Sequence, residues 1–285
     1  MGGMSGTYAL CWLNGRTMRT EEARIDPDDR GFLLGDGVFE TVLLRRGQAV
    51  WWQEHVQRLR HGAQVLGMTP PDVDVLSNAF GEIVAANNLD NVDESVLRIT
   101  FSRGSGGRGL SAGAGKEATL LLRASAMAAS SDVARAMIVE SVRRNGSSVS
   151  SRLKTLSYVD GVLAQREAEA QGFSEALLRN DIGRLVCGAR ANLFVWRNAE
   201  LWTPPIEEGC LPGIARGYLL DVARNTGIVC REESLEDLRA DDCVLLTNSL
   251  RGVVVLAEVG GVALRPADKC GDLTALLSAF RKRMA

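Results

Sequence analysis

A short segment of small and polar residues near the middle of the chain separates two series of strand-like and helix-like segments. Residues 124–132 read ASAMAASSD, a composition that is typical of a connection between elements. The chain has 285 residues, which is enough for two domains because a domain usually contains about 100–200 residues. We therefore expect the chain to cross from one domain to a second over residues 124–132.

In the first part of the chain, hydrophobic periodicity predicts a sheet with two helices. Residues 54–66 place apolar side chains at helical spacing on one face, and residues 73–87 repeat this pattern. Asn14-Gly15 favours a tight hairpin turn. Strands are predicted over residues 8–13, 37–44, 95–102 and 118–123.

The second part alternates in the same way, and the two parts together predict an α+β fold with mixed sheets. A helix is predicted over residues 157–171, where Gly172 ends it, and another over residues 214–225, just after Pro212-Gly213. Strands are predicted over residues 137–141, 175–178, 185–187, 192–196, 243–247 and 252–259.

Composition argues against several classes of protein. The formal net charge of −2 does not suit a nucleic-acid-binding protein, which would usually carry a strongly basic face. No apolar run approaches the roughly 18 residues of a membrane span, and the N-terminus lacks the pattern of a secretory signal, so we expect a cytoplasmic protein. Six cysteines without a C-x-x-C pair and only two histidines make a metal site improbable.

Lysine is scarce in this sequence. Of the 33 basic residues, four are lysines (Lys116, Lys154, Lys269 and Lys282), so 33 − 4 leaves 29 arginines. Lysine can form an imine and arginine cannot, which draws attention to Lys154 in the middle of the chain, just before a predicted helix. Taken alone, a solvated surface lysine is the simpler interpretation.

The run Gly104–Gly109 matches the G-x-G-x-x-G pattern of a dinucleotide site. Such a site needs a helix to begin there, whereas the sequence continues into a Gly/Ala-rich stretch and another strand. Two interpretations remain. The stretch is either a mobile hairpin loop, or a loop that covers the substrate and offers Arg103 and Arg108 to an anionic group.

Several motifs in order along almost the whole chain resemble the class IV aminotransferase family, the fold-type IV pyridoxal phosphate enzymes. The matching pieces are residues 30–32 (RGF), 35–41 (GDGVFET), 55–59 (HVQRL), 153–157 (LKTLS), 191–194 (ANLF), 211–216 (LPGIAR) and 246–249 (LTNS). The resemblance implies a smaller N-terminal α/β domain (residues 1–123), a linker (124–132) and a larger C-terminal domain (133–285) that carries the Schiff-base lysine. It also implies a homodimer.

The resemblance implies a role for each matching position. Lys154 is expected to hold the pyridoxal 5'-phosphate as a Schiff base and to act in catalysis. The other expected cofactor contacts are Arg58, Cys187, Gly213, Ile214, Ala215, Thr247 and Asn248. Expected substrate contacts are Phe39, Arg103, Arg108 and Ser249.

Within the family, residues 102–109 and the run Thr247–Gly252 look most like 4-amino-4-deoxychorismate lyase. That substrate carries two carboxylates, which suits two nearby arginines. We therefore expect elimination of pyruvate to give 4-aminobenzoate for folate synthesis. The alternatives are a D-amino acid or branched-chain aminotransferase, or a homologue with little turnover.

One position departs from the family pattern. Members usually carry a glutamate five residues before the asparagine of the Asn-Leu-Phe motif, where it keeps the ring nitrogen of the cofactor protonated. Counting back from Asn192 reaches Cys187, and a buried thiol favours its neutral form. Either the reaction works with a less protonated ring, as we expect for a lyase, or Asp181 replaces the missing acid, or ordinary catalysis has been lost.

Overall fold

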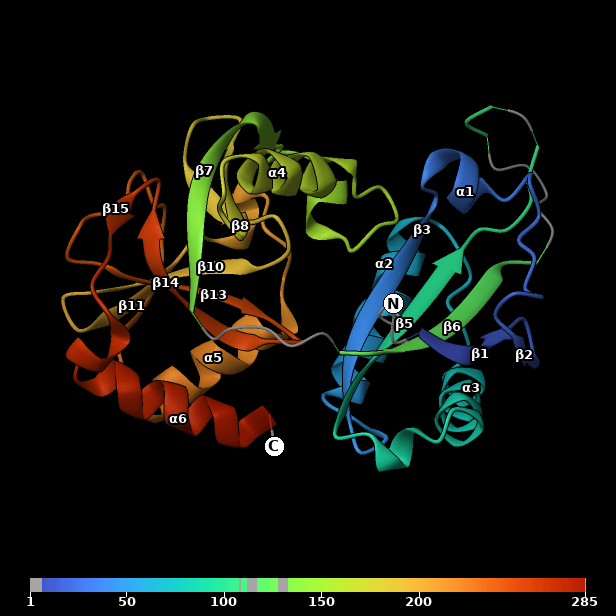
Figure 1. The fold of residues 1–285 in the computed structure, drawn as a ribbon. Coiled ribbons are helices and arrows are strands. Elements are labelled where there is room, and N and C mark those ends of the chain that lie inside the picture. The colour runs from blue at the N-terminus through green and yellow to red at the C-terminus, as the bar shows by residue number, and fades with distance from the viewer. Residues whose placement is uncertain (1–6, 108, 112–116, 128–132, 285) are drawn as a thin grey trace. The chain divides into compact units, whose positions relative to one another are not determined.

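The computed structural model describes residues 7–107, 109–111, 117–127 and 133–284, with side chains from residue 9 onward. The chain divides into two compact units (Figure 1). Unit 1 is Met1–Ala129 together with Lys154–Ser157, and unit 2 is Ser130–Leu153 and Tyr158–Ala285. In this described part of the chain, no helix is long and apolar enough to cross a membrane.

Unit 1 is an antiparallel sheet of six strands in the order β2-β1-β6-β5-β3-β4. Its strands are β1 (Thr7–Leu13), β2 (Arg16–Arg19), β3 (Gly37–Arg45), β4 (Gln48–Ala49), β5 (Glu94–Ser102) and β6 (Thr119–Ala126). Its helices are the short α1 (Arg30–Leu34), then α2 (Trp52–Val65) and α3 (Val73–Ala86). The strands and the two long helices predicted from periodicity are thus present.

Helices α2 and α3 pack on the sheet of unit 1 through their apolar faces (Figure 1). Alternate residues of β3 and β5 point into this core, because successive side chains of a strand lie on opposite faces. The core residues from the two strands are Val38, Val42, Leu44, Leu97, Ile99 and Phe101. The helices contribute Val56, Leu59, Ala63, Leu76, Ala79 and Ile83.

The segment that contains Lys154 pairs with the first residues of β3. The amide of Phe39 donates to the carbonyl of Lys154 (2.9 Å), and the amide of Leu156 donates to the carbonyl of Gly37 (2.9 Å). This edge of β3 is open because β4 is only two residues long and pairs at the other end, with Leu44 and Arg45. The pairing explains why Lys154–Ser157 belongs to unit 1, whereas the sequence had assigned the lysine to the C-terminal domain.

Unit 2 is built on a mixed sheet of nine strands. Its strands are β7 (Val133–Arg144), β8 (Glu175–Asn180), β9 (Leu185–Gly188), β10 (Asn192–Arg197), β11 (Glu200–Thr203), β12 (Cys230–Glu232), β13 (Cys243–Asn248), β14 (Gly252–Val259) and β15 (Val262–Ala263). Its helices are α4 (Val159–Ala170), α5 (Ile214–Asn225) and α6 (Asp272–Met284).

Six of these strands close into a small barrel. The order β10-β13-β14-β7-β8-β9 returns to β10 because Asn192 pairs with Cys187 of β9. Closure leaves few free edges and fixes the register of neighbouring strands. One face of the strands carries a core that includes Leu177, Leu193 and Leu246, and the other packs Ala164 and Ala168 of α4.

Several other features of the fold differ from the sequence-based expectation. Residues 124–126, expected in the linker, form the end of β6 and pair with β5. The C-terminal helix α6 and the short strands β11 and β12 were not predicted. The helix α6 buries Leu273, Leu276 and Phe280. The remaining domain boundaries stay a prediction.

Gly37, at the start of β3, has no room for a side chain. A Cβ atom there would lie 2.5 Å from the carbonyl oxygen of Phe101 and 2.8 Å from Cα of Ser102. We therefore expect Gly37→Ala to destabilise unit 1 by about 1–3 kcal/mol, the usual cost of overpacking. Urea denaturation followed by circular dichroism measures the change.

The matched control is Gly81, in the middle of α3, where a Cβ atom would meet nothing within 4 Å. Gly81→Ala should stabilise the chain by about 0.5–1 kcal/mol, because alanine loses less backbone entropy in a helix. A Gly37→Ala protein as stable as the Gly81→Ala protein would contradict the close approach at β3.

Candidate active site

Lys154 lies beside an aromatic ring and a guanidinium group in unit 1. Its Nζ is 4.3 Å from the centroid of the Phe39 ring, and Cζ of Arg98 is 3.9 Å from the same centroid. Phe39 is buried and Lys154 is half-buried. The pairing of the Lys154 segment with β3 thus brings an amine, an aromatic ring and a guanidinium from three segments of the chain together.

The environment of Lys154 makes its amine easier to deprotonate than an ordinary lysine. Burial is the largest cause and lowers the pKa of Lys154 to about 8. The charge of Glu40 acts in the opposite direction, while those of Arg58 and Arg98 lower the pKa further. A lysine with such a pKa can react as a neutral nucleophile or act as a base near neutral pH.

Arg58, expected to bind the cofactor phosphate, is held by a buried carboxylate. Its Nε and Nη2 donate to the two oxygens of Glu40, at 2.7 Å each, and Nδ1 of His55 lies 2.7 Å from Glu40 Oε2. Burial alone would raise the pKa of Glu40, but the charge and hydrogen bonds of Arg58, with those of His55, lower it to about 2. The sequence motifs gave no role to Glu40 or His55, although an acid inside an otherwise apolar strand is a signal of a buried charge.

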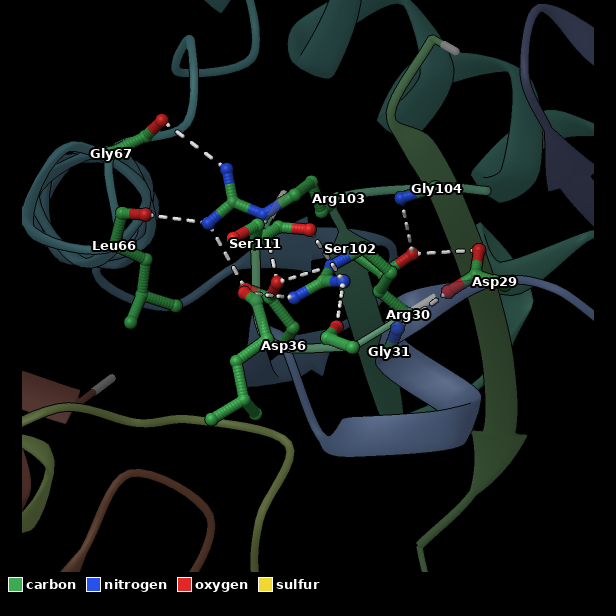
Figure 2. Close-up of polar contacts among 12 residues, drawn as sticks. Asp29, Arg30, Gly31, Asp36, Leu66, Gly67, Ser102, Arg103, Gly104 and Ser111 are labelled. Atoms are coloured by element: carbon green, nitrogen blue, oxygen red, sulfur yellow. Dashed lines mark hydrogen bonds and ion pairs between the residues drawn. The ribbon is translucent and has the colours of Figure 1, made fainter. Parts of the chain in front are cut away.

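Arg103, expected to contact substrate, is bound within unit 1 (Figure 2). Its guanidinium donates to both oxygens of Asp36 (2.7 and 3.1 Å) and to the carbonyls of Leu66 (2.6 Å) and Gly67 (3.3 Å). These bonds connect the end of β5 to the end of α2. Arg108, the other arginine expected at the substrate, lies outside the described residues.

A second arginine on Asp36 holds the glycine-rich loop in place (Figure 2). Arg30 is buried, and its Nε donates to Asp36 Oδ2 (2.9 Å). Its other nitrogens donate to the carbonyls of Gly109 (2.9 Å), Leu110 (3.0 Å) and Ser111 (3.4 Å). The guanidinium bonds of Arg103 and Arg30 to Asp36 outweigh the effect of burial and lower the pKa of that carboxyl. Gly104 and residues 109–111 are therefore held by Arg30, and β6 is the next element described after them.

In unit 2, Asn192 lies next to three candidate cofactor residues, Cys187, Thr247 and Gly213. Asn192 of β10 pairs with Cys187 of β9 and with Thr247 of β13. The side chain of Asn192 donates from Nδ2 to the carbonyl of Leu211 (2.8 Å). A Cβ atom on Gly213 would lie 2.0 Å from Asn192 Oδ1, so only glycine fits there. Asn192, to which the sequence motifs gave no role, thus connects the barrel to the N-terminus of α5.

This part of unit 2 has the donors that a phosphate group requires. The hydroxyl of Thr247 is buried and has no hydrogen-bond partner among the described residues. Helix α5 begins at Ile214 and Ala215 with Gly213 as its N-cap, and no described side chain caps its first amides. A helix N-terminus with a nearby hydroxyl is well suited to an anion. The residues present therefore fit the phosphate of the expected cofactor.

Asn248 is the last residue of β13, and Ser249 follows it in the turn to β14. The side-chain oxygen of Asn248 accepts hydrogen bonds from the amides of Leu250 (3.1 Å) and Arg251 (2.9 Å). Asn248 therefore shapes this turn, and Ser249 is half-buried in it. Their contacts with cofactor and substrate stay a prediction.

Cys187 is a buried thiol. Burial raises its pKa, and the nearby positive charge of Arg144 only partly offsets this effect, so the thiol stays neutral near neutral pH. Asp181, considered as a replacement acid, is exposed and accepts a hydrogen bond from the amide of Gly146 (3.2 Å). Neither residue supplies a buried negative charge at position 187.

Comparison with known proteins identifies the family. The family described as "Amino-transferase class IV" matches this chain over residues 37–259. The chain belongs to this family. It is 30% identical over 268 residues to a "Putative branched-chain-amino-acid aminotransferase" of Methanocaldococcus jannaschii, with 92% of each chain covered. It is 26% identical over 280 residues to an "Aminodeoxychorismate lyase" of Bacillus subtilis, covering 96% of this chain and 94% of that one.

Comparison with solved structures identifies the fold. The PLP-bound form of "a hypothetical aminotransferase from Mycobacterium tuberculosis" matches with a TM-score of 0.83 and 23% identity, over 97% of this chain and 99% of that one. The fold is that of the fold-type IV pyridoxal phosphate enzymes, as expected from the sequence. The chain is a pyridoxal phosphate-dependent class IV enzyme, either an aminotransferase or a lyase.

The hydroxyl of Thr247 gives a test of the phosphate site. Thr247→Val should leave the apoprotein as stable as before, or more stable by up to about 1 kcal/mol, because it removes a buried hydroxyl that has no partner among the described residues. The same change should raise the Kd for pyridoxal phosphate by about 10-fold or more, since a hydrogen bond to a charged group is lost. Thermal unfolding and equilibrium titration measure the two effects.

Thr203 is the matched control, since it is also a buried threonine of unit 2 and donates its hydroxyl hydrogen to the carbonyl of Leu193 (2.7 Å). Thr203→Val should cost stability and leave cofactor affinity unchanged. The site would be refuted if Thr247→Val lost stability like the control and bound the cofactor normally.

The lowered pKa of Lys154 predicts a pH dependence. A group with a pKa of about 8 is neutral in about one molecule in ten at pH 7, against about one in 3000 for an ordinary lysine. The rate at which apoprotein captures pyridoxal phosphate should therefore rise about tenfold per pH unit below pH 8 and level off above it. Visible absorbance after rapid mixing follows this rate.

Lys154→Ala is the control and should give no absorbance of a lysine-bound cofactor at any pH. A capture rate that continued to rise to pH 10 would mean that Lys154 titrates as an ordinary lysine.

Proposed function

We propose that the protein is an aminotransferase that takes an α-amino acid as amino donor. The observation that supports this most is the arrangement around Phe39, where the amine of Lys154 and the guanidinium of Arg98 lie against one ring. An α-amino acid presents one amine and one carboxylate on the same carbon. A lysine that holds the cofactor and an arginine that binds the carboxylate suit this pair of groups.

In the proposed amino transfer, Lys154, Arg98 and Phe39 each have a separate role. Pyridoxal phosphate supplies the electron-withdrawing group that makes the proton on the amine-bearing carbon acidic. The Nζ of Lys154, with its lowered pKa, would act as the base that takes up this proton and later gives it back. Arg98 holds the substrate carboxylate, and the ring of Phe39 shields the amine of Lys154 from water.

The relatives favour the same activity. The names of the matched proteins include a "Putative branched-chain-amino-acid aminotransferase", a "Branched-chain-amino-acid aminotransferase" of Escherichia coli at 26% identity and a "D-alanine aminotransferase" of Listeria monocytogenes at 28%. The sequence-based expectation of a lyase depended in part on two loop arginines that reach the substrate. Arg103 is bound to Asp36, which weakens this support, and its contact with substrate stays a prediction.

A lyase that forms 4-aminobenzoate from 4-amino-4-deoxychorismate is the second candidate, and Cys187 favours it. A neutral thiol at position 187 cannot stabilise a protonated ring nitrogen as a carboxylate would. Elimination that yields an aromatic product demands less electron withdrawal than amino transfer does. The match to the "Aminodeoxychorismate lyase" of Bacillus subtilis supports this candidate as well. The homodimer and the cytoplasmic location stay predictions.

Substrate assays with the purified holoenzyme test the proposal. L-Leucine, L-valine, L-isoleucine and D-alanine are each offered with 2-oxoglutarate, and 4-amino-4-deoxychorismate is offered alone. We expect glutamate to form from at least one amino acid, and Arg98→Gln to raise KM for that donor by about 10-fold or more because the carboxylate loses a charged partner. Arg45→Gln, which changes an arginine at the far end of β3, is the control and should leave KM unchanged.

Formation of 4-aminobenzoate and pyruvate without any amino transfer would overturn the proposal in favour of the lyase. In that case Cys187→Glu, which supplies the missing acid, should bring amino transfer to a measurable level.

A further inference from the structure

Glu40 is a fully buried carboxylate on a strand whose neighbouring core positions are apolar. Its side chain is 0% exposed, and Val38, Val42 and Leu44 of the same strand belong to the apolar core. A buried ion pair is a poor source of stability, because apolar residues of similar size often serve the fold equally well. The carboxylate at this position therefore points to a role beyond stability.

Three donors converge on the two oxygens of this carboxylate. Arg58 Nε donates to Oε1 and Arg58 Nη2 to Oε2, and the ring of His55 contacts Oε2 from one turn earlier on α2. Because Glu40 is ionised, Nδ1 of His55 carries the proton and donates. A bidentate contact fixes both the plane and the rotation of a guanidinium. Arg58 is therefore held in one orientation on the α2 side of β3.

Glu40 also acts on the charge of Lys154, because it is next to Phe39, whose amide donates to the carbonyl of Lys154 (2.9 Å) and whose ring centroid is 4.3 Å from Nζ. The groups whose charges act on this amine are Glu40 of β3, Arg58 of α2 and Arg98 of β5, which are two cations and one anion. Without the anion, two positive charges would face the amine and disfavour its protonated form. Glu40 keeps its own negative charge throughout the neutral range.

We propose that Glu40 is a positioning residue that holds the Arg58 guanidinium ready for the phosphate of the cofactor and supplies the negative charge that balances Arg58 and Arg98 beside Lys154. The proposal rests on the proposed function for the role of Lys154, and on the expected role of Arg58 at the cofactor phosphate. It assigns two separable effects to one carboxylate, a geometric effect on Arg58 and an electrostatic effect on Lys154.

The two effects predict changes of opposite direction when the charge is removed. Loss of the bidentate contact weakens binding of a phosphate-bearing ligand. Loss of the negative charge lowers the pKa of Lys154, so more of its amine is neutral at pH 7 and its reaction with an aldehyde is faster. A general loss of folding would slow that reaction and cannot produce the second change.

The experiment compares pyridoxal phosphate with pyridoxal, which lacks the phosphate, on full-length apoprotein. For Glu40→Gln we expect the Kd of pyridoxal phosphate to rise by about 10-fold to 100-fold, as for loss of a charge-assisted contact. The rate of reaction with pyridoxal at pH 7 should increase. The pH at which this rate levels off, called the plateau below, should fall below 8. Glu94→Gln, which removes an acid paired with Arg45 (3.1 Å), is the matched control and should change neither property.

Two further variants separate geometry from charge and serve if Glu40→Gln does not fold. Glu40→Asp keeps the charge but shortens the side chain, so it should weaken pyridoxal phosphate binding and leave the pH profile with pyridoxal unchanged. Arg58→Gln removes a cation, so it should weaken pyridoxal phosphate binding and move the plateau above pH 8. The plateau thus moves in opposite directions for Glu40→Gln and Arg58→Gln.

The proposal is overturned if Glu40→Gln, or Glu40→Asp in its place, binds pyridoxal phosphate as well as the unchanged protein does. It is also overturned if Arg58→Gln and Glu40→Gln move the plateau in the same direction. Failure of the proposed function would be seen separately, as absence of amino transfer by the unchanged protein while these binding effects persist.

Discussion

The backbone pairing of residues 154–156 with the open edge of β3 is the constraint on which the candidate site depends. Two hydrogen bonds, from Phe39 to Lys154 and from Leu156 to Gly37, place the lysine beside β3 although more than a hundred residues separate them in sequence. The same strand carries Phe39 and Glu40. Strand β4 is too short to cover this edge, so the length of one edge strand decides where the reactive amine is held.

The buried charged contacts of unit 1 described above are made by arginines, in keeping with the excess of arginine over lysine in the sequence. Arg30, Arg58 and Arg103 each use the planar guanidinium to bind a carboxylate, through Asp36 or Glu40, and two of them also bind carbonyl oxygens. A lysine could not make these several directed contacts at once. The scarcity of lysine thus has a structural counterpart. The arginines bind carboxylates and carbonyl oxygens within unit 1, whereas Lys154 provides a reactive amine.

Much of the fold was predictable because periodicity reports which face of an element is buried. The two helices of unit 1 and the strands β5, β10 and β13 were predicted in this way. The end of β6 was missed because Ala124 and Ser125 look like a linker, although pairing with β5 draws them into the sheet. The helix α6 was missed because the family motifs end near residue 259, although Leu273, Leu276 and Phe280 repeat at helical spacing beyond them.

A residue of the candidate site was predictable where a family motif contains it. It was not predictable where only a contact with a residue far away in sequence identifies it. Lys154, Arg58 and Thr247 came from motifs of the family, whereas Glu40, His55, Arg98 and Asn192 became apparent through contacts with them. Arg103, expected at the substrate, is bound by Asp36, a contact that the sequence did not predict. Sequence spacing cannot show which acid an arginine meets.

The closed barrel of unit 2 has a consequence for how an enzyme of this kind can change during evolution. Position 187 is fixed by backbone pairing with Leu178 on one side and Asn192 on the other, and these bonds do not depend on the side chain. A substitution at this position would exchange a thiol for an acid without a shift of register. The backbone pairing of the barrel therefore places no demand on the side chain at position 187, so this residue can change during evolution while the fold is kept.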